Sequence, residues 1–515
     1  MNVSPTKKGS KVSINALSST LQVVITGLVY FLLYKFLLNR LGASQLGVWS
    51  LVMSTTSLGN LANFGLTSGL VKFVAEYKAR SDHDRIPSLV ITALITISVL
   101  FALITTLIYF GAPYFLKFII EKKSLADALK ILPLSLFSLI VNAIGGVLTS
   151  TLEGFQLNYQ RHIIYVMGMI SFAVFTYFLV PIWGLTGVGY AQDIQSIIVL
   201  AVSVFQVFRV LRPEGHLLRN VSAGWDYQIF QTLISYGLKF QLISICQMLF
   251  EPIVKGLLSK YSGLQSVAYY EMANRLVSQI RGLIISANQT MIPLIATAKL
   301  KSQSEVRYIY IKSIKIIFLV EVPLVTLMII VTPLISVVWL NKIEPQFLIF
   351  LYLLLSATFV HILNGPAYFG ILGEGRLSAM MLVYIIMLVV NVLLSYSFSI
   401  VIPDYGSVLG GIIAIITGTI TMSYIYQKVN QIAFSDLFGK EEGYMIGIGL
   451  AISFLSAFLC SKFDTTAGII ISTLISLILF SITFIPLLLK NKAFNLLVVG
   501  FPKINNVLIK FKLQN

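Results

Sequence analysis

Long apolar stretches separated by short polar connections run through almost the whole chain. A transmembrane helix needs about 20 predominantly apolar residues to cross a hydrocarbon core of about 30 Å. The longest connections are residues 209–228, 428–443 and 111–129, too short for a separate soluble domain. The pattern therefore predicts an all-α integral membrane protein of about 14 transmembrane helices. The expected spans are 15–38, 46–75, 88–111, 130–152, 163–181, 184–208, 229–257, 264–296, 313–338, 346–372, 378–402, 405–427, 444–461 and 466–489.

The two halves of the chain match each other at an almost constant offset of 220 to 222 residues. Pro113 matches Pro333, and Glu153-Gly154 matches Glu374-Gly375. Six spans separate the equivalent positions, so both halves have the same orientation, as in parallel transporter repeats. We predict two six-helix lobes at 1–215 and 222–430, two additional transmembrane helices at 444–489 and a basic cytoplasmic tail at 490–515.

Composition and charge support a membrane protein and indicate its orientation. Hydrophobic residues make up 57% of the chain, charged residues only 11%, and mean hydropathy is +0.88, whereas soluble proteins carry about 25% charged residues. Lys and Arg number 24 on the side that carries both termini and 10 on the other. The excess predicts cytoplasmic termini, and it explains the net charge of +17 without nucleic-acid binding.

Polar residues recur along one face of the first two spans of each half. Exposing an ionisable side chain to lipid costs free energy, so such residues in spans face the interior of the helix bundle or a water-filled cavity. We therefore expect these faces to line a lumen. Its expected polar lining comprises Gln22, Asn60, Asn63, Gln247 and Asn274.

Three cations within the spans are candidates for binding an anionic head group. Counting residues at about 1.5 Å each places Lys239 and Arg275 near the bilayer midplane and Arg281 closer to the cytoplasm. We predict that they form a cationic, substrate-binding lumen. For Arg275 the alternative is a structural pair with Glu271, four residues earlier on the same helix. Lys255 lies near a helix end, where snorkelling to the interface would explain it.

Acidic residues in the spans are candidates for taking up H⁺ or Na⁺ as a coupling ion. They are Asp193, Glu321 and Glu251, and Glu251 has Lys255 as an alternative partner. Interhelical salt bridges would produce the same pattern for all three.

Small residues and proline interrupt two corresponding spans, at Gly145-Gly146 and at Gly365-Pro366. Paired interruptions of this kind point to a transport pathway, although close helix packing is the alternative. His361 has no second His or Cys nearby in the sequence, so we predict no metal site.

Catalytic sequence motifs are absent, so we predict neither enzymatic activity nor a cofactor. A GxxxxGK[ST] sequence, which an ATPase would need, does not occur. A membrane-embedded polysaccharide polymerase is a rival, but such enzymes usually have a large outer loop, and residues 111–129 are too few to form one.

Several short segments resemble the opening of bacterial polysaccharide flippases. They are Asn39-Arg40-Leu41-Gly42, Leu46-Gly47-Val48-Trp49 and Asn63-Phe64-Gly65-Leu66. These flippases are the O-antigen and capsule repeat-unit (Wzx-type) transporters of the multidrug/oligosaccharidyl-lipid/polysaccharide exporter superfamily. Fourteen spans are also similar to the lipid II flippase branch.

The resemblance implies two lobes around a central lumen and transport by alternating access. The cargo would be an undecaprenyl-diphosphate-linked oligosaccharide, moved to the outer leaflet of the bacterial inner membrane for lipopolysaccharide or capsule synthesis. Membrane lipid, H⁺ or Na⁺ and polysaccharide-assembly proteins would be the other partners. A lipid II-type precursor flippase and a cation-coupled multidrug exporter are the alternatives.

Overall fold

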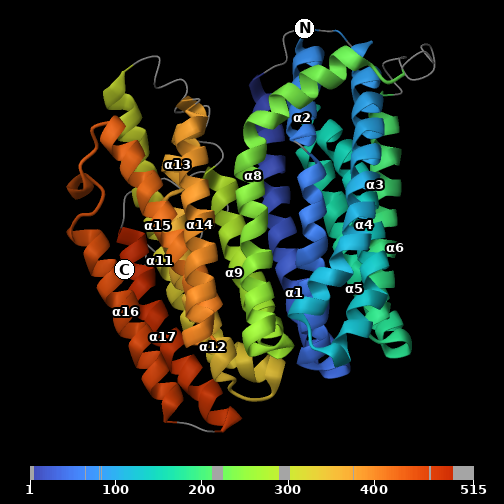
Figure 1. The fold of residues 1–515 in the computed structure, drawn as a ribbon. Coiled ribbons are helices and arrows are strands. Elements are labelled where there is room, and N and C mark those ends of the chain that lie inside the picture. Colours follow the sequence, from blue (N-terminus) through green and yellow to red (C-terminus); the bar gives the residue numbers. More distant parts are fainter. Residues whose placement is uncertain are drawn as a thin grey trace. The chain divides into compact units, whose positions relative to one another are not determined.

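The computed structural model describes residues 5–63, 65–80, 82, 84–211, 224–288, 302–374, 376–462 and 465–490, and helices account for nearly all of them (Figure 1). Within these ranges, 12 helices are long and apolar enough to cross a membrane. The chain divides into two compact units. Unit 1 comprises Met1–Gln279 and Met380–Ala414, and unit 2 comprises Ile280–Ala379 and Ile415–Asn515. The lobe boundaries expected from the sequence repeat stay a prediction.

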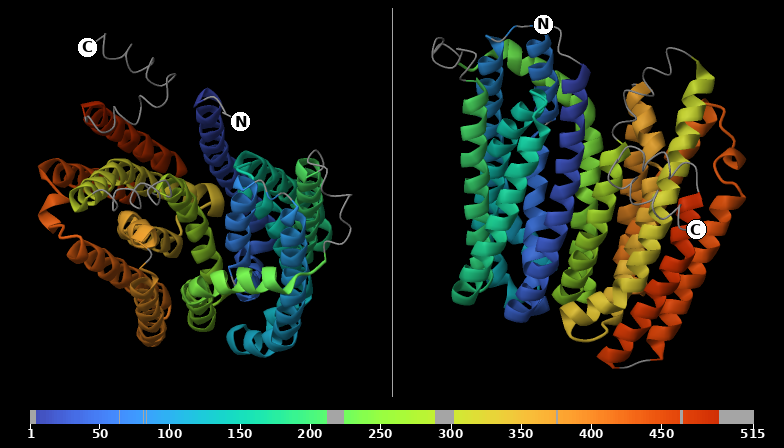
Figure 2. Two further views of the ribbon diagram at one scale, coloured as in Figure 1. Left: turned by 90° about the horizontal axis from the view of Figure 1, so that it is seen from above. Right: turned by 180° about the vertical axis from the view of Figure 1, so that it is seen from behind.

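Unit 1 contains the N-terminal helices together with α8, most of α9 and α14, and the start of α15. Helix α8 contacts α1, α2 and α3, and Figures 1 and 2 show its first part running across α2 and α3. The elements are α1 (Pro5–Ser57), η1 (Leu58–Asn63), α2 (Leu66–Ala79), α3 (Arg85–Ile119), α4 (Lys122–Gly154), α5 (Asn158–Trp183), α6 (Leu185–Leu211), α8 (Tyr227–Ser262), α9 (Leu264–Asn288), α14 (Leu377–Val401) and α15 (Gly406–Val429).

Unit 2 is built on the long helix α11 (Gln303–Leu340), which packs against α12 (Pro345–Leu363), α13 (Gly365–Glu374), α16 (Lys440–Ser461) and α17 (Thr466–Lys490). The 3₁₀ turn η3 (Phe434–Asp436) precedes α16. A core of Phe318 and Val322 from α11, Ile452 from α16 and Phe484 from α17 joins three of these helices. The two additional helices at the C-terminal end therefore pack on α11 through an apolar interface.

Two glycines mark where the helices of the first two predicted spans are interrupted. Gly42 has φ 77° and ψ 167°, so α1 consists of two helical segments joined at a kink. Gly65 has φ 67° and stands at the N-cap of α2. Such positive φ values favour glycine because it lacks a Cβ. The second predicted span is thus divided among the end of α1, η1 and α2.

The predicted number of spans and the twelve apolar helices differ for a physical reason. One of the twelve, Ser18–Asn63, includes the kink at Gly42. Helix α9 is not among the twelve, because it carries Glu271, Arg275 and Arg281 within a short length. The count of fourteen stays a prediction.

The prediction of a long connection at residues 111–129 is wrong. Helix α3 extends to Ile119 and α4 begins at Lys122, so only two residues join them. Lys117 and Lys122 are on helices, not in a loop. Helical hydrogen bonding can continue beyond an apolar stretch wherever water solvates the side chains, so hydropathy marks the lipid-facing length and not the end of the helix.

Side-chain hydrogen bonds connect the helices inside unit 1. Trp49 Nε1 of α1 donates to Gln192 Oε1 of α6 at 3.1 Å, and Asn142 Nδ2 of α4 donates to Ser196 Oγ of α6 at 2.9 Å. Ser259 Oγ of α8 donates to the carbonyl of Ile119 at 2.7 Å. In a membrane protein such bonds satisfy polar groups that lipid cannot, and they help to fix how the helices pack.

The closest approach between α1 and α9 requires a glycine. A Cβ on Gly47 would lie 1.9 Å from the carbonyl oxygen of Leu264. The backbones of the two helices therefore meet at this point, next to the buried Leu46 and Val48.

Gly47→Ala should destabilise the protein, because the two backbones must separate to admit the methyl group. We expect a loss of about 1–3 kcal/mol, the usual cost of overpacking, seen as a lower midpoint of thermal unfolding in lipid nanodiscs. Gly111→Ala is the matched control, because nothing lies within 4 Å of a Cβ there. Equal midpoints for the two variants would contradict this close approach.

Candidate functional site

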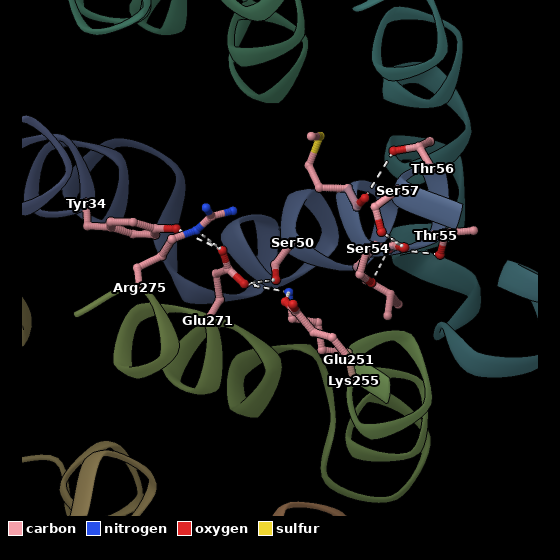
Figure 3. Close-up of polar contacts among 12 residues, drawn as sticks. Tyr34, Ser50, Ser54, Thr55, Thr56, Ser57, Glu251, Lys255, Glu271 and Arg275 are labelled. Carbon is pink, nitrogen blue, oxygen red and sulfur yellow. Dashed lines mark hydrogen bonds and ion pairs between the residues drawn. The ribbon is translucent and has the colours of Figure 1, made fainter. Parts of the chain in front are cut away.

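Two polar faces predicted from the sequence, those of residues 229–257 and 264–296, contribute to one buried cluster within unit 1 (Figure 3). Helix α8 supplies Glu251 and Lys255, and α9 supplies Glu271 and Arg275. Helix α1 adds Tyr34 and Ser50. We call these six residues the charge cluster.

The Glu271 carboxylate is the centre of the charge cluster. Its Oε1 accepts hydrogen bonds from Arg275 Nε at 2.5 Å and from the Tyr34 hydroxyl at 3.2 Å. Its Oε2 accepts from Lys255 Nζ at 2.5 Å and from Ser50 Oγ at 3.1 Å. Lys255 Nζ also contacts Glu251 Oε1 at 2.5 Å. Figure 3 shows these side chains converging from α1, α8 and α9.

Charges in the cluster alternate in sign from Glu251 through Lys255 and Glu271 to Arg275, so the cluster has no net charge. The side chains of Lys255 and Glu271 are only 2% exposed, whereas those of Arg275 and Glu251 are 36% and 44% exposed. A buried ion survives only when it is paired and hydrogen-bonded. The pair Lys255–Glu271 is therefore structural, whereas Arg275 and Glu251 remain partly accessible to solvent.

The structural alternative for Arg275 is present, because its guanidinium is paired with Glu271 and lies over the Tyr30 ring at 5.2 Å. The expected pairing of Glu251 with Lys255 is present too. Snorkelling of Lys255 was the wrong expectation. The fold places Glu271 beside it, and no sequence pattern pointed to this contact between neighbouring helices.

Of the three predicted cations, the charge cluster contains Arg275. The side chain of Lys239 lies outside the described part of the structure. Arg281 is half-buried and belongs to unit 2, across the division at Gln279. A cationic lumen formed by Lys239, Arg275 and Arg281 therefore stays a prediction.

Two of the predicted polar lining residues, Asn60 and Asn63, border a cavity of about 240 Å³ in unit 1. Arg161 lies at its border, pairs with Glu153 at 2.7 Å and lies over the Tyr165 ring. The cavity thus offers amides, hydroxyls, one guanidinium and aromatic faces. Its lining is Asn60, Asn63, Thr67, Ile97, Phe101, Asn142, Ala143, Gly146, Thr149, Ser150, Arg161 and Tyr165.

The remaining predicted lining residues lie elsewhere. Gln22 contacts the ring nitrogen Nδ1 of His162 on α5. Gln247 is exposed and Asn274 is half-buried. Arg161 and Tyr165 are not among the residues predicted from the sequence, because they lie at the start of a span, where charged and aromatic residues are ordinary.

The three acidic candidates have different surroundings. Asp193 accepts a hydrogen bond from Ser138 Oγ at 2.6 Å, and Glu251 is paired with Lys255. Glu321 on α11 is 0% exposed, and neither carboxylate oxygen has a hydrogen-bond partner among the described residues. Binding of a coupling ion at any of them stays a prediction.

Only one of the two expected helix interruptions is present. Helix α4 runs unbroken through Gly145 and Gly146, so the expected break there is wrong. A Cβ on Gly145 would lie 3.8 Å from Val199 Cγ1 of α6, an ordinary contact distance. Helix α12 ends at Leu363 and α13 begins at Gly365. Two adjacent glycines do not break a helix whose hydrogen bonds have no competitor in lipid, whereas Pro366 lacks the N–H that would continue one.

The model of the family described as "Polysaccharide biosynthesis protein" matches residues 12–299. The chain belongs to this family. The matched part of the chain includes the charge cluster and every residue that borders the cavity. This match confirms the resemblance to polysaccharide-related membrane proteins that the sequence indicated.

The chain resembles a curated protein in sequence and solved structures in fold. It is 25% identical to "Stage V sporulation protein B" of Bacillus subtilis (strain 168) over 264 residues, so the match spans about half of each protein (48% of this chain and 49% of the relative). It also resembles a solved structure of the lipid II flippase MurJ in an inward closed conformation. That match has a TM-score of 0.69 and 13% identity, and covers 90% of this chain and 97% of the other.

A multidrug resistance MATE family transporter of the MOP superfamily, in its inward-facing conformation, matches with a TM-score of 0.67 and 14% identity. This match covers 80% of the present chain and 98% of the transporter. At such low identities the two structures establish the fold alone. The protein is therefore a multi-pass membrane protein with the fold of MOP transporters and flippases.

Glu271→Leu should destabilise the protein strongly, because Lys255 and Arg275 lose their shared carboxylate. Breaking a buried pair typically costs about 3–5 kcal/mol, seen as a lower midpoint of thermal unfolding in nanodiscs. Glu251→Gln is the control. It removes the most exposed charge of the cluster and should cost no more than about 1 kcal/mol. Equal losses in the two variants would refute the central role of Glu271.

Proposed function

We propose that this family member is a flippase for undecaprenyl-diphosphate-linked oligosaccharide, the repeat unit of a surface polysaccharide such as O-antigen or capsule. It moves this cargo from the cytoplasmic to the outer leaflet of the bacterial inner membrane by alternating access. Both termini lie in the cytoplasm, in agreement with the distribution of Lys and Arg. Transport is coupled to an ion, H⁺ or Na⁺.

The observation that supports the proposal best is the polar cavity inside a membrane-spanning unit. Asn60, Asn142 and Thr149 provide hydrogen-bond donors and acceptors there, and Tyr165 provides an aromatic surface. These groups suit the hydroxyls and ring faces of a sugar. At about 240 Å³ the cavity is smaller than typical drug-sized pockets of roughly 300–1,000 Å³, which fits a short saccharide segment better than a bulky drug.

Binding of the diphosphate is assigned to the cations Lys239, Arg275 and Arg281. A guanidinium has five N–H donors, and Glu271 engages the Nε of Arg275, whose side chain is 36% exposed. The two terminal nitrogens of this group suit a phosphate oxygen. The carboxylate behind it fixes the orientation of the guanidinium, which lowers the ordering cost of binding.

Two alternatives have a specific observation in their favour. The match to MurJ favours a lipid II-type peptidoglycan precursor, which would share the lipid diphosphate and differ in the sugar. The match to a MATE transporter, together with the buried Glu321, favours cation-coupled drug export. The family description and the sugar-compatible cavity favour the polysaccharide repeat unit.

Deletion of the gene should leave lipid-linked glycan on the cytoplasmic face and abolish surface polysaccharide. The measurement is labelling of surface glycan, together with extraction of lipid-linked glycan from the membrane. The wild-type gene should restore display.

When it replaces the wild-type gene, the Asn60→Leu variant should reduce surface display about tenfold, because a lost hydrogen bond costs about 1–1.5 kcal/mol. Thr106→Val, on an exposed hydroxyl of α3 that donates to the carbonyl of Ala102 in the same helix, should restore display fully.

Normal surface glycan in the deletion strain, together with raised drug sensitivity, would overturn the proposal in favour of export. Loss of peptidoglycan synthesis with unaffected surface glycan would instead support the lipid II-type cargo.

Charge should matter more than shape at the proposed diphosphate-binding cations. Lys239→Arg should keep transport, because either side chain presents a positive charge to a phosphate. Lys239→Ala and Arg281→Ala should impair transport at unchanged protein levels in the membrane. Arg275→Ala should lower the amount of protein, and removing Glu271 as well should lower it further, because the buried Lys255 then also loses its carboxylate partner. Full transport by the triple Ala variant would contradict a cationic lumen.

A further inference from the structure

Glu321 is a buried carboxyl group that has no counter-charge bonded to it among the described residues. It lies halfway along α11, is 0% exposed, and neither oxygen has a hydrogen-bond partner among the described residues. It is therefore an unusual acid, because buried carboxylates are normally paired or hydrogen-bonded.

Glu271 provides an internal comparison at nearly the same burial. Glu271 is 1% exposed and is contacted by Lys255, Arg275, Tyr34 and Ser50. Two cations and two hydroxyls compensate its charge, so it can stay ionised. Glu321 has none of these partners, and an isolated carboxylate in an apolar environment neutralises by taking up a proton. The surroundings of Glu321 therefore favour the neutral carboxylic acid.

No charged side chain described on the surrounding helices bonds to Glu321 and so favours its ionised form. Lys315 on the same helix lies 3.9 Å from Glu442 of α16, a distance within ion-pair range. None of the other titratable side chains described on α11 or on the helices packed against it bonds to Glu321. These are Glu305, Arg307, Tyr308, Tyr310 and Lys312 of α11, Tyr352 and His361 of α12, Tyr368 and Glu374 of α13, Tyr424, Tyr426 and Lys428 of α15, and Lys440, Glu441, Tyr444 and Cys460 of α16.

The helix can bend next to the acid. Pro323 lies two residues after Glu321, inside α11. Proline has no N–H, so the carbonyl of Leu319 loses its helical hydrogen bond, and helices bend at such positions. A bend of α11 at this point would change the access of water to Glu321, and hydration would favour release of its proton.

We propose that Glu321 is the proton-binding site of unit 2, protonated in the arrangement described here and deprotonated when α11 bends and admits water. This inference deepens the proposed function, because it makes the coupling ion a proton and assigns the group that carries it. The carboxyl releases H⁺ to water and regains it from water, so no other reactant is needed.

The first test measures protonation directly, with the full-length protein in lipid nanodiscs. The infrared spectrum of the wild type at pH 7 should contain the C=O stretching band of a protonated carboxylic acid, and Glu321→Gln should remove it. Glu374→Gln is the matched control from unit 2. The Glu374 side chain is 4% exposed but is paired with Arg376 at 3.6 Å and accepts a hydrogen bond from Asn430 at 3.2 Å. This control should keep the band, and identical spectra for wild type and Glu321→Gln would overturn the proposal.

The second test measures coupling in proteoliposomes that contain undecaprenyl-diphosphate-linked glycan extracted from the deletion strain. A proton gradient should change the flipping rate of the wild type, whereas Glu321→Gln should lose this response. Flipping by Glu321→Gln with an unchanged response would overturn the coupling role and leave the proposed function intact. Absence of flipping by the wild type would instead count against the proposed function, and the infrared result would still decide the protonation of Glu321.

Discussion

The Glu271 carboxylate holds α1, α8 and α9 together within unit 1. It accepts hydrogen bonds from all three helices, at a depth where its side chain is 2% exposed. A charge at such a position is tolerated only because opposite charges and donors surround it completely. The close contact of Gly47 with Leu264 lets α1 and α9 approach each other. The packing of the backbone and the compensation of the charge therefore depend on each other.

The charge cluster also changes how cations inside a membrane protein are interpreted. From depth alone, Arg275 is a candidate for binding an anion. Within the fold it is half of an ion pair that remains partly exposed, so the same side chain can stabilise the bundle and face a ligand. The cavity near Arg161 has the same character, since Glu153 balances the guanidinium there. Both sites combine polar groups with little net charge, which suits the many hydroxyls of the proposed cargo.

Glu271 and Glu321 represent two solutions to the same problem of an acid without water. The charge of Glu271 is compensated by neighbouring side chains, whereas Glu321 has no hydrogen-bond partner among the described residues and is neutral only while it holds a proton. The first solution fixes a structure, because separating the partners is costly. The second responds to hydration, so it is sensitive to movements of its helix. A buried carboxylate can thus have either of two roles in this fold.

Hydropathy by itself predicted the helical class, most of the spans and the polar faces, because lipid forces each spanning backbone to satisfy its hydrogen bonds within a helix. It also offered the pairs Glu271–Arg275 and Glu251–Lys255, since residues four apart share a helix face. Only the tertiary structure brought Lys255 to Glu271 on the next helix, and Tyr34 to Glu271 across 237 residues of sequence. It also left Glu321 without a partner among the described residues. Contacts within a helix follow from its period, whereas contacts between helices depend on how their faces pack, which no local pattern of residues encodes.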